Sequence, residues 1–244
     1  MRFFRIYLFH LKQYVSNHYF FWLTITSTVS IFFLQYIVAY ANHDLADSQI
    51  WIKSGVFGLW SSTTTAAGSI GFQRFQGTLP YLLNTQYDER GSLIALLLPA
   101  SSYGLTSFPI SFVMAKILSV SVGSISLSLV ISVLFLWAGA ALMGILIASF
   151  FTLTPNALVY EELINLPIIL LSGLFGSEKI LNPLTNVTQW VIPITAPVAR
   201  LTGRSSSLSW LAFLTSFGIW IVIILLVVRR INDLSKEKGT LKVI

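Results

Sequence analysis

The side chains that could carry out covalent or acid–base chemistry are few and widely separated in this chain. A nucleophilic hydrolase needs an activated serine or cysteine with a base held beside it. The chain has no cysteine, and its three histidines, His10, His18 and His43, all lie outside the long apolar stretches. Residues 68–71, Gly-Ser-Ile-Gly, resemble a serine-protease motif, but no histidine lies in another apolar stretch to serve it. We therefore expect a protein that is not an enzyme.

Metal and nucleotide sites are not expected either. No cluster of His, Asp and Glu has the spacing of a metal site, and no glycine-rich loop ends in the Lys-Ser or Lys-Thr of a phosphate-binding loop. If the work of this protein consumes ATP, a partner must therefore hydrolyse it. The basic residues flank apolar segments and form no patch for phosphates, so no nucleic-acid partner is expected.

Glu161 and Glu162 form an adjacent acidic pair at the start of an expected apolar span. Carboxylates inside a bilayer are costly and are by default candidates for a functional site. The other explanation is that both residues lie in the first turn of a helix, where the positive end of the helix dipole favours them. The residues alone leave both explanations open.

The composition is that of a membrane protein. The 244-residue chain is 55% hydrophobic, its mean hydropathy is +0.78, and only 10% of its residues are charged. Soluble domains carry about 25% charged residues, so we expect one all-α integral membrane domain over residues 1–244. The apolar runs leave room for six transmembrane helices of about 20 residues each.

Two further segments have their own character. Residues 1–18 combine basic side chains with apolar ones at spacings of three and four, which predicts an amphipathic helix on the membrane surface. Residues 176–209 are interrupted by Pro183, Pro193 and Pro197, so a re-entrant pair of short helices is expected at the outer interface. The six expected spans cover residues 19–41, 51–71, 92–118, 124–150, 161–175 and 211–228.

The charge distribution orients this bundle. An even number of spans places both termini on one side, together with the polar segment 72–91 between spans two and three. That side carries ten Lys and Arg residues, including those of the tail 229–244, against five on the other side. Because basic loops stay cytoplasmic, both termini and segment 72–91 are expected in the cytoplasm.

The second expected span is rich in small and hydroxylated residues. Ser62, Thr63 and Ala66 lie near its middle, where contact with lipid would not favour hydroxyl groups. This face must pack against other helices or line a transport path. A ridge of small residues in the fourth span, from Ser124 to Ala148, leaves the same two alternatives open.

The polar segment 72–91 has the features of a short helix. Thr78 can cap this helix, and Pro80 falls in its first turn, where proline is tolerated. The residues that then share one face are Leu79, Leu82 and Leu83. A helix of about two and a half turns cannot bury that face by itself. It must lie on the membrane or fit into a groove of another protein.

Three short motifs follow one another along the chain. The first is the basic, Gly-Thr-Leu-containing segment, with the residues Arg74, Gly77, Thr78, Leu79, Leu82 and Leu83. Residues 166–175, Leu-Pro-Ile-Ile-Leu-Leu-Ser-Gly-Leu-Phe, and 190–195, Trp-Val-Ile-Pro-Ile-Thr, supply the other two. Together they resemble the permease subunits of type-2 ABC exporters, in which the first motif forms the coupling helix that docks on the ATPase. That family commonly has Glu where Pro80 stands, and Thr-Pro where Thr85 and Gln86 stand.

The resemblance implies the transmembrane subunit of an ATP-driven exporter in a bacterial plasma membrane. Two such subunits, identical or paired with a related permease, would join two separate ABC ATPase subunits. ATP and Mg²⁺ would bind to those ATPases, and no cofactor to this chain. The cargo would be amphiphilic: a peptide or bacteriocin, an antibiotic or other drug, or a lipid. Path candidates are Ser62, Thr63, Ala66, Glu161 and Glu162, and outer-gate candidates are Ser172, Gly173, Phe175 and Pro193.

A second interpretation stays open beside the exporter. The chain could be a non-transporting membrane scaffold or an immunity protein that binds a partner without ATP-driven cycling. The two interpretations differ in one observation, because only the exporter requires an ATPase that copurifies with the chain.

Overall fold

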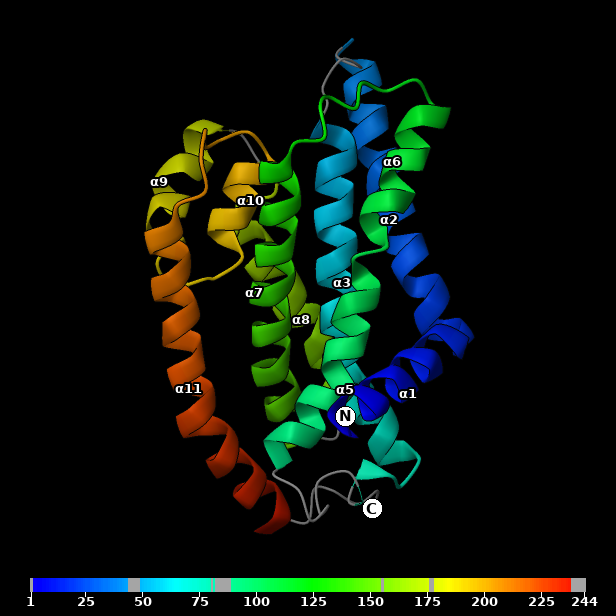
Figure 1. The fold of residues 1–244 in the computed structure, drawn as a ribbon, viewed down its shortest axis with the longest axis vertical. Helices are drawn as coiled ribbons and strands as arrows, with labels where there is room; N and C mark the ends of the chain where they lie inside the picture. The colour runs from blue at the N-terminus through cyan, green and yellow to red at the C-terminus, as the bar shows by residue number, and fades with distance from the viewer. Residues whose placement is uncertain are drawn as a thin grey trace.

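The chain folds into an elongated bundle of helices (Figure 1). The computed structural model describes residues 2–43, 49–79, 81, 89–154, 156–175 and 178–237. Within these residues it contains helices and no strands, so the expected all-α fold is confirmed. The helices are α1 (Arg2–Ser16), α2 (His18–Ala41), α3 (Gln49–Phe75), α5 (Glu89–Gly104), α6 (Ser107–Ile117), α7 (Leu127–Phe151), α8 (Ala157–Leu171), α9 (Glu178–Thr188), α10 (Thr195–Leu201) and α11 (Trp210–Glu237).

Four helical stretches in the described part of the chain are long and apolar enough to cross a membrane, which indicates a membrane protein. They are α2, residues 94–117 of α5 and α6, α7, and residues 210–228 of α11. α2 and α11 are the least buried of the four, and they expose large apolar side chains such as Ile37 and Leu226. Such surfaces are suited to contact with lipid, because the backbone groups of a helix are already paired.

α3 lies at the centre of the bundle and is buried along most of its length. It contacts α2, α5, α6, α7, α8 and α10. Small residues make these approaches possible, since a helix without bulky side chains lets neighbouring backbones come close. Gly144 of α7 faces the Thr63 methyl group, and Gly58 faces Thr28 of α2 and Ser107 of α6. The small-residue ridge of α7 therefore packs within the subunit from Ser132 onward, whereas Ser124 and Ser128 are exposed.

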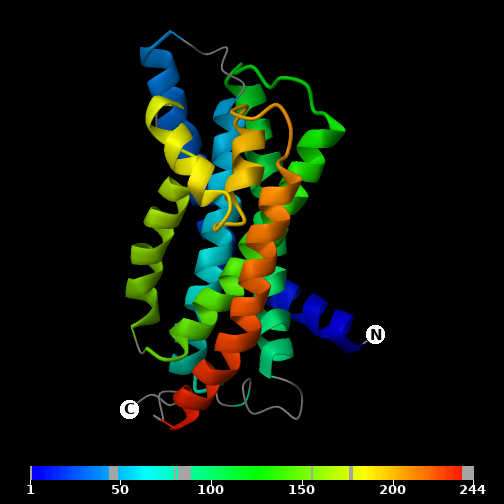
Figure 2. The ribbon, with the colours of Figure 1, turned by 90° about the vertical axis from the view of Figure 1, so that its left-hand side faces the viewer.

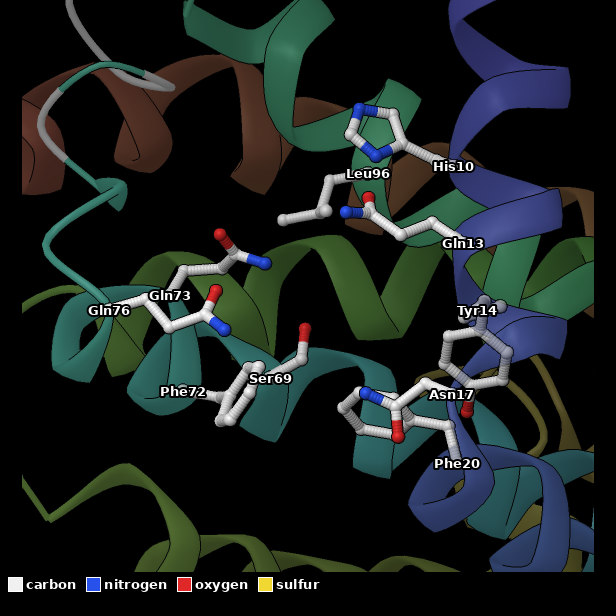
Figure 3. A pocket seen from close by; sticks show the side chains of 11 residues that line it. His10, Gln13, Tyr14, Asn17, Phe20, Ser69, Phe72, Gln73, Gln76 and Leu96 are labelled. Atoms are coloured by element: carbon white, nitrogen blue, oxygen red, sulfur yellow. The ribbon is translucent and has the colours of Figure 1, made fainter.

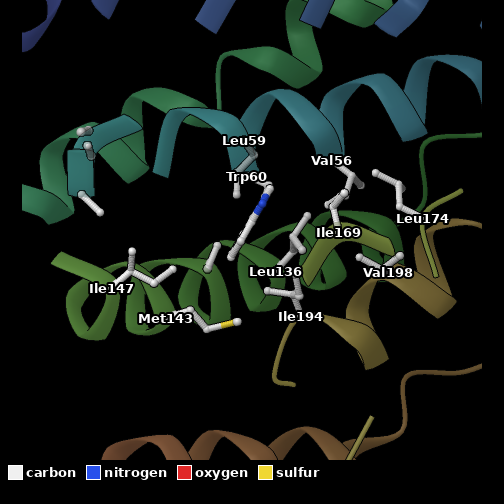
Figure 4. Packing of buried hydrophobic residues seen from close by; sticks show 14 of the residues in the cluster. Val56, Leu59, Trp60, Leu136, Met143, Ile147, Ile169, Leu174, Ile194 and Val198 are labelled. Carbon is white, nitrogen blue, oxygen red and sulfur yellow. The ribbon is translucent and has the colours of Figure 1, made fainter. Parts of the chain in front are cut away.

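The large apolar side chains of the core join α3 to the helices on its other side (Figure 4). Trp60 is fully buried and lies between α3 and α7. The same cluster contains residues of α3, α7, α8 and α10 and the residue that precedes α10: Val56, Leu59, Leu136, Met143, Ile169, Ile194 and Val198. In a bilayer such contacts stabilise through close packing more than through release of water. This packing joins α8 and α10 to the central helix.

Two expected boundaries in the middle of the chain differ from the structure. The third expected span, 92–118, is divided into α5 and α6, because α5 ends at Gly104 against the backbone of Leu59. α7 begins at Leu127, later than expected, since the Ser126 side chain accepts a hydrogen bond from the Leu129 amide and caps the helix.

The two ends of the bundle are built differently. α1 lies across one end at a steep angle to the long axis, as Figures 1 and 2 show. α1 is the amphipathic helix that was predicted in residues 1–18, and it exposes Phe4 and Phe9. α9 and α10 lie at the opposite end, where short helices are expected in residues 176–209. The described end of α11 returns to the end that carries α1.

Replacing Gly58 tests the close approach of α2, α3 and α6. A Cβ atom at this position would lie 2.6 Å from Ser107 Cβ and closer still to the Thr28 hydroxyl. We expect Gly58→Ala to destabilise the fold by about 1–3 kcal/mol, because the helices must move apart. The measurement is the midpoint of thermal unfolding in detergent micelles. Gly218→Ala in α11 is the matched control, since a Cβ there meets open space; equal midpoints for the two variants would contradict the packing.

Candidate functional site

Arg74 fixes the end of α3 to the end of α7. Its side chain is only 4% exposed and donates hydrogen bonds to the main-chain carbonyls of Phe151, Thr152 and Thr154. The bond to Thr152 is 2.7 Å and that to Phe151 is 3.2 Å. A cation at a helix C-terminus satisfies carbonyls that lack helical partners and interacts favourably with the helix dipole. Burial lowers the pKa of the guanidinium from its ordinary value, yet arginine remains charged in proteins.

Gly77 and Thr78 end α3. The Gly77 amide donates to the Arg74 carbonyl at 2.9 Å, and the Thr78 amide donates to the Gln73 carbonyl at 3.0 Å. With Gly77 at φ +71°, these bonds form a Schellman motif, which requires a residue that tolerates left-handed backbone. The Thr78 hydroxyl also donates back to the Gln73 carbonyl at 3.0 Å. Its side chain therefore bonds to the preceding helix, and the expected cap of a following helix stays a prediction, because residues 82–88 lie outside the described ones.

The remaining coupling candidates are only partly described. Leu79 is fully buried within the subunit. Pro80, Leu82 and Leu83 lie outside the described residues. Phe75 and Tyr81, which the sequence pattern did not single out, are 78% and 79% exposed. The large side chains that this segment presents at its surface therefore include two aromatic ones, while Arg74 and Leu79 face inward.

The hydroxyl face of α3 is filled by other helices. The Ser62 hydroxyl donates to the Ala100 carbonyl of α5 at 3.0 Å and lies 3.5 Å from the Tyr14 hydroxyl of α1. The Thr63 hydroxyl donates to the Leu59 carbonyl, one turn back in α3. Ser62, Thr63 and Ala66 are all buried. Of the two expected alternatives for this face, packing is observed, and lining of a path stays a prediction.

The acidic pair lies in α8, but not where the dipole explanation requires. α8 begins at Ala157 and has no acidic residue in its first turn, so Glu161 lies in the second turn. Glu161 is 9% exposed, and the side chain of Glu162 lies outside the described residues. Asn165, one turn further, is 8% exposed, and its buried Oδ1 has no hydrogen-bond partner among the described residues. The i, i+4 spacing from Glu161 was the signal that could have identified Asn165 from the sequence.

The outer-gate candidates Ser172 and Gly173 form the turn that ends α8. Gly173 has φ +76°, and Ser172 is fully buried. Arg204 reaches this turn from the segment after α10 and donates to the Ser172 carbonyl at 3.3 Å and to the Thr202 hydroxyl at 3.1 Å. The guanidinium occupies the space that a side chain at Gly173 would need. Arg204 was missed because nothing in its local sequence points to α8.

Phe175 and Pro193 attach the same region to the central helices. The Phe175 ring lies 6.0 Å from the ring of Phe57 in α3. The Pro193 backbone packs against Gly139 of α7, where a Cβ would come within 3.2 Å of it. All four outer-gate candidates therefore lie in one region, built by the end of α8 and the α9–α10 connection.

A polar pocket lies at the opposite end, where α1 meets the bundle (Figure 3). Its volume is about 140 Å³, and side chains from α1, α3 and α5 line it together with the start of α2. Tyr14 and Phe20 form an aromatic wall, with ring centroids 4.8 Å apart. Besides Tyr14, the described side chains with hydrogen-bonding groups that line it are His10, Gln13, Asn17, Ser69, Gln73 and Gln76.

No group of His, Cys, Asp and Glu in the described part of the chain could hold a metal ion. The structure instead contains two arginines that fix helix ends, Arg74 at α7 and Arg204 at α8. Comparison with protein-family models, with curated proteins and with solved structures found no match for the chain.

Proposed function

We propose that the chain is the permease subunit of a type-2 ABC exporter, which moves an amphiphilic substrate out of a bacterial cell with separate ATPase subunits. One observation carries the proposal. The segment that resembles the family's coupling helix is bonded through buried Arg74 to the end of α7, a long helix of the bundle. A force applied to this segment by a partner would therefore reach the bundle directly.

The proposal includes six membrane crossings. α3 has 27 residues, or about 40 Å of helix, which exceeds the roughly 30 Å hydrocarbon core. Its Ser and Thr side chains lower its hydropathy, but they are buried against neighbouring helices. α8 has 15 residues, or about 22 Å, so its crossing is completed by the turn at Gly173 and by α9 and α10. Both termini and the segment 72–91 then lie in the cytoplasm.

The transport path is placed beside α8. Ser62 and Thr63 are enclosed by α1, α5 and α7 in this conformation. Glu161 and Asn165 are also buried, but they bring polar groups to α8, whose other face exposes leucines such as Leu163. A polar pair on one side and apolar residues on the other suit an amphiphilic cargo. A second subunit, identical or related, would supply the opposite wall.

Replacing Leu82 and Leu83 with Asp tests docking. We expect the Leu82→Asp/Leu83→Asp double variant to lose at least tenfold of the ABC ATPase that copurifies with the tagged chain, because charges replace the apolar face of the docking helix. The measurement is quantitative mass spectrometry of the complex extracted from native membranes. The matched control is Leu184→Asp/Val187→Asp, which changes two exposed residues of α9 at the other end of the bundle. Full retention of the ATPase by the first variant would disprove the docking assignment.

A non-transporting scaffold or immunity protein is the second candidate. Such a protein would use the exposed aromatic residues Phe75 and Tyr81 to bind a partner without ATP. If no ABC ATPase copurifies with the wild-type chain, this function replaces the exporter.

A further inference from the structure

The polar pocket beneath α1 exists because α1 turns away from the bundle axis. α1 packs on α5 and touches α2, and the angle leaves space above the last turns of α3 (Figure 3). Tyr14 fixes α1 at this place, since its ring is 9% exposed and its hydroxyl lies 3.5 Å from the Ser62 hydroxyl. The pocket is therefore part of the fold and is open at the surface.

Among the described residues, no side chain that lines the pocket carries a permanent charge. The amides of Gln13, Gln73 and Gln76 each offer two donors and an acceptor, and all three side chains are directed into the same space in Figure 3. Burial lowers the pKa of His10 from its ordinary value and outweighs the opposite effect of a hydrogen bond with Gln13, so the imidazole is neutral at pH 7. The buried His10 Nδ1 has no hydrogen-bond partner within the described ranges. A phosphate or a carboxylate would find no cation among the described lining residues, and a cation would find no carboxylate there.

The position of the pocket corresponds to the surface of a membrane. The helices around it expose aromatic side chains, with Phe9 at 62% on α1 and Tyr19 and Trp22 at 60% and 54% on α2. Exposed Trp and Tyr near the end of an apolar helix are typical of the headgroup region. A lipid with its headgroup in the pocket could lay its acyl chains along the exposed face of α2.

We infer that this pocket binds the neutral, hydroxyl-bearing headgroup of a membrane lipid, such as a hexose on diacylglycerol, from the leaflet at the α1 end. Hydroxyl groups both donate and accept, as the carboxamides around them do. The aromatic wall of Tyr14 and Phe20 provides an apolar surface for the C–H face of a sugar ring. This inference depends on a membrane location but not on the exporter function.

The test is native mass spectrometry of the protein in a detergent without a sugar headgroup. Monoglucosyl diacylglycerol and phosphatidylglycerol with identical acyl chains are added in separate titrations. We expect the glucosyl lipid to bind at least fivefold more tightly, and Gln13→Leu/Gln76→Leu to weaken its binding about tenfold, because two hydrogen-bonding side chains are lost. Both glutamines are exposed at the pocket rim, so the variant is expected to fold. Gln189→Leu, beyond α9 at the far end, is the control.

Three results would overturn the inference. Equal binding of the two lipids would show that the pocket does not recognise hydroxyl groups. Unchanged binding by the double glutamine variant would place the lipid elsewhere and leave the pocket filled by water only. Free glucose that binds as tightly as the glucosyl lipid would identify a soluble polyol, in place of a lipid, as the occupant.

Discussion

An Arg74→Met variant is expected to be less stable than the wild type by about 3 kcal/mol, because a charged hydrogen-bond donor is lost from buried carbonyls. Arg74 is 4% exposed and donates hydrogen bonds to three main-chain carbonyls at the end of α7, those of Phe151, Thr152 and Thr154. Methionine can fill much of the same volume but donates no hydrogen bond. The carbonyls of Phe151 and Thr152 would then be left without this partner inside the protein.

The midpoint of thermal unfolding in micelles measures this effect, and two variants make the result specific. Arg74→Lys keeps the charge but replaces a planar group with several donors by a single ammonium, so it should recover only part of the stability. Lys116→Met removes a cation from the exposed end of α6 and should leave the midpoint nearly unchanged. An Arg74→Met midpoint equal to that of Lys116→Met would show that the α3–α7 bond contributes nothing.

Arg74 also separates docking from coupling in the proposed exporter. Because Arg74 is buried, Arg74→Lys leaves the exposed surface of the segment, including Phe75 and Tyr81, as it is. We therefore expect the ATPase still to copurify while substrate-stimulated ATP hydrolysis falls. Loss of the ATPase from Arg74→Lys would mean that the residue acts in docking after all.

Elements with a strong local pattern could be predicted from the sequence. α2 and α7 are continuous apolar runs, and α1 alternates polar and apolar residues at helical spacing, so each follows from its own residues. The short helices α9 and α10 follow from prolines that prevent a full crossing. The start of α8 was predicted less well. The apolar span is expected to begin at the acidic Glu161, whereas the helix begins at Ala157.

The direction in which a polar side chain points could not be predicted in the same way. Arg74 was grouped with the docking segment because that segment resembles a coupling helix, and its hydrogen-bond partners lie about 80 residues away at the end of α7. Gly77 fits a turn signal equally well as the start of one helix or as the end of another, and the hydrogen bonds to α3 decide between them. Arg204 meets α8 only through the tertiary fold. Such contacts depend on how the helices are arranged, which the spacing of residues within one helix does not specify.

The turn at Gly173 provides the second large expected effect, and it lies at the proposed outer gate. Gly173→Ala is expected to destabilise the fold by about 3 kcal/mol, since a left-handed backbone costs an L-residue about 1–2 kcal/mol and the Arg204 hydrogen bond to α8 adds a similar amount. Gly173 has φ +76°, and its missing Cβ leaves room for the Arg204 guanidinium and the Thr185 methyl group. Gly77→Ala is the matched control, because Gly77 has φ +71° with nothing within 4 Å of a Cβ. Gly77→Ala should lose only the roughly 1–2 kcal/mol that the left-handed backbone costs.

A double-mutant cycle separates the backbone strain at Gly173 from the contact with Arg204. If the guanidinium is what the new methyl group displaces, Gly173→Ala should cost less in an Arg204→Ala background than in the wild type. If Gly173→Ala lowers the stability equally in both backgrounds, glycine is needed at this position only for its backbone conformation. In the proposed exporter this turn lies at the end of the molecule opposite the ATPase, so Gly173→Ala should impair transport while the ATPase still copurifies. That pattern is distinct from the Leu82→Asp/Leu83→Asp result, because a gate can fail without any loss of docking, whereas a permease that has lost its ATPase cannot transport at all.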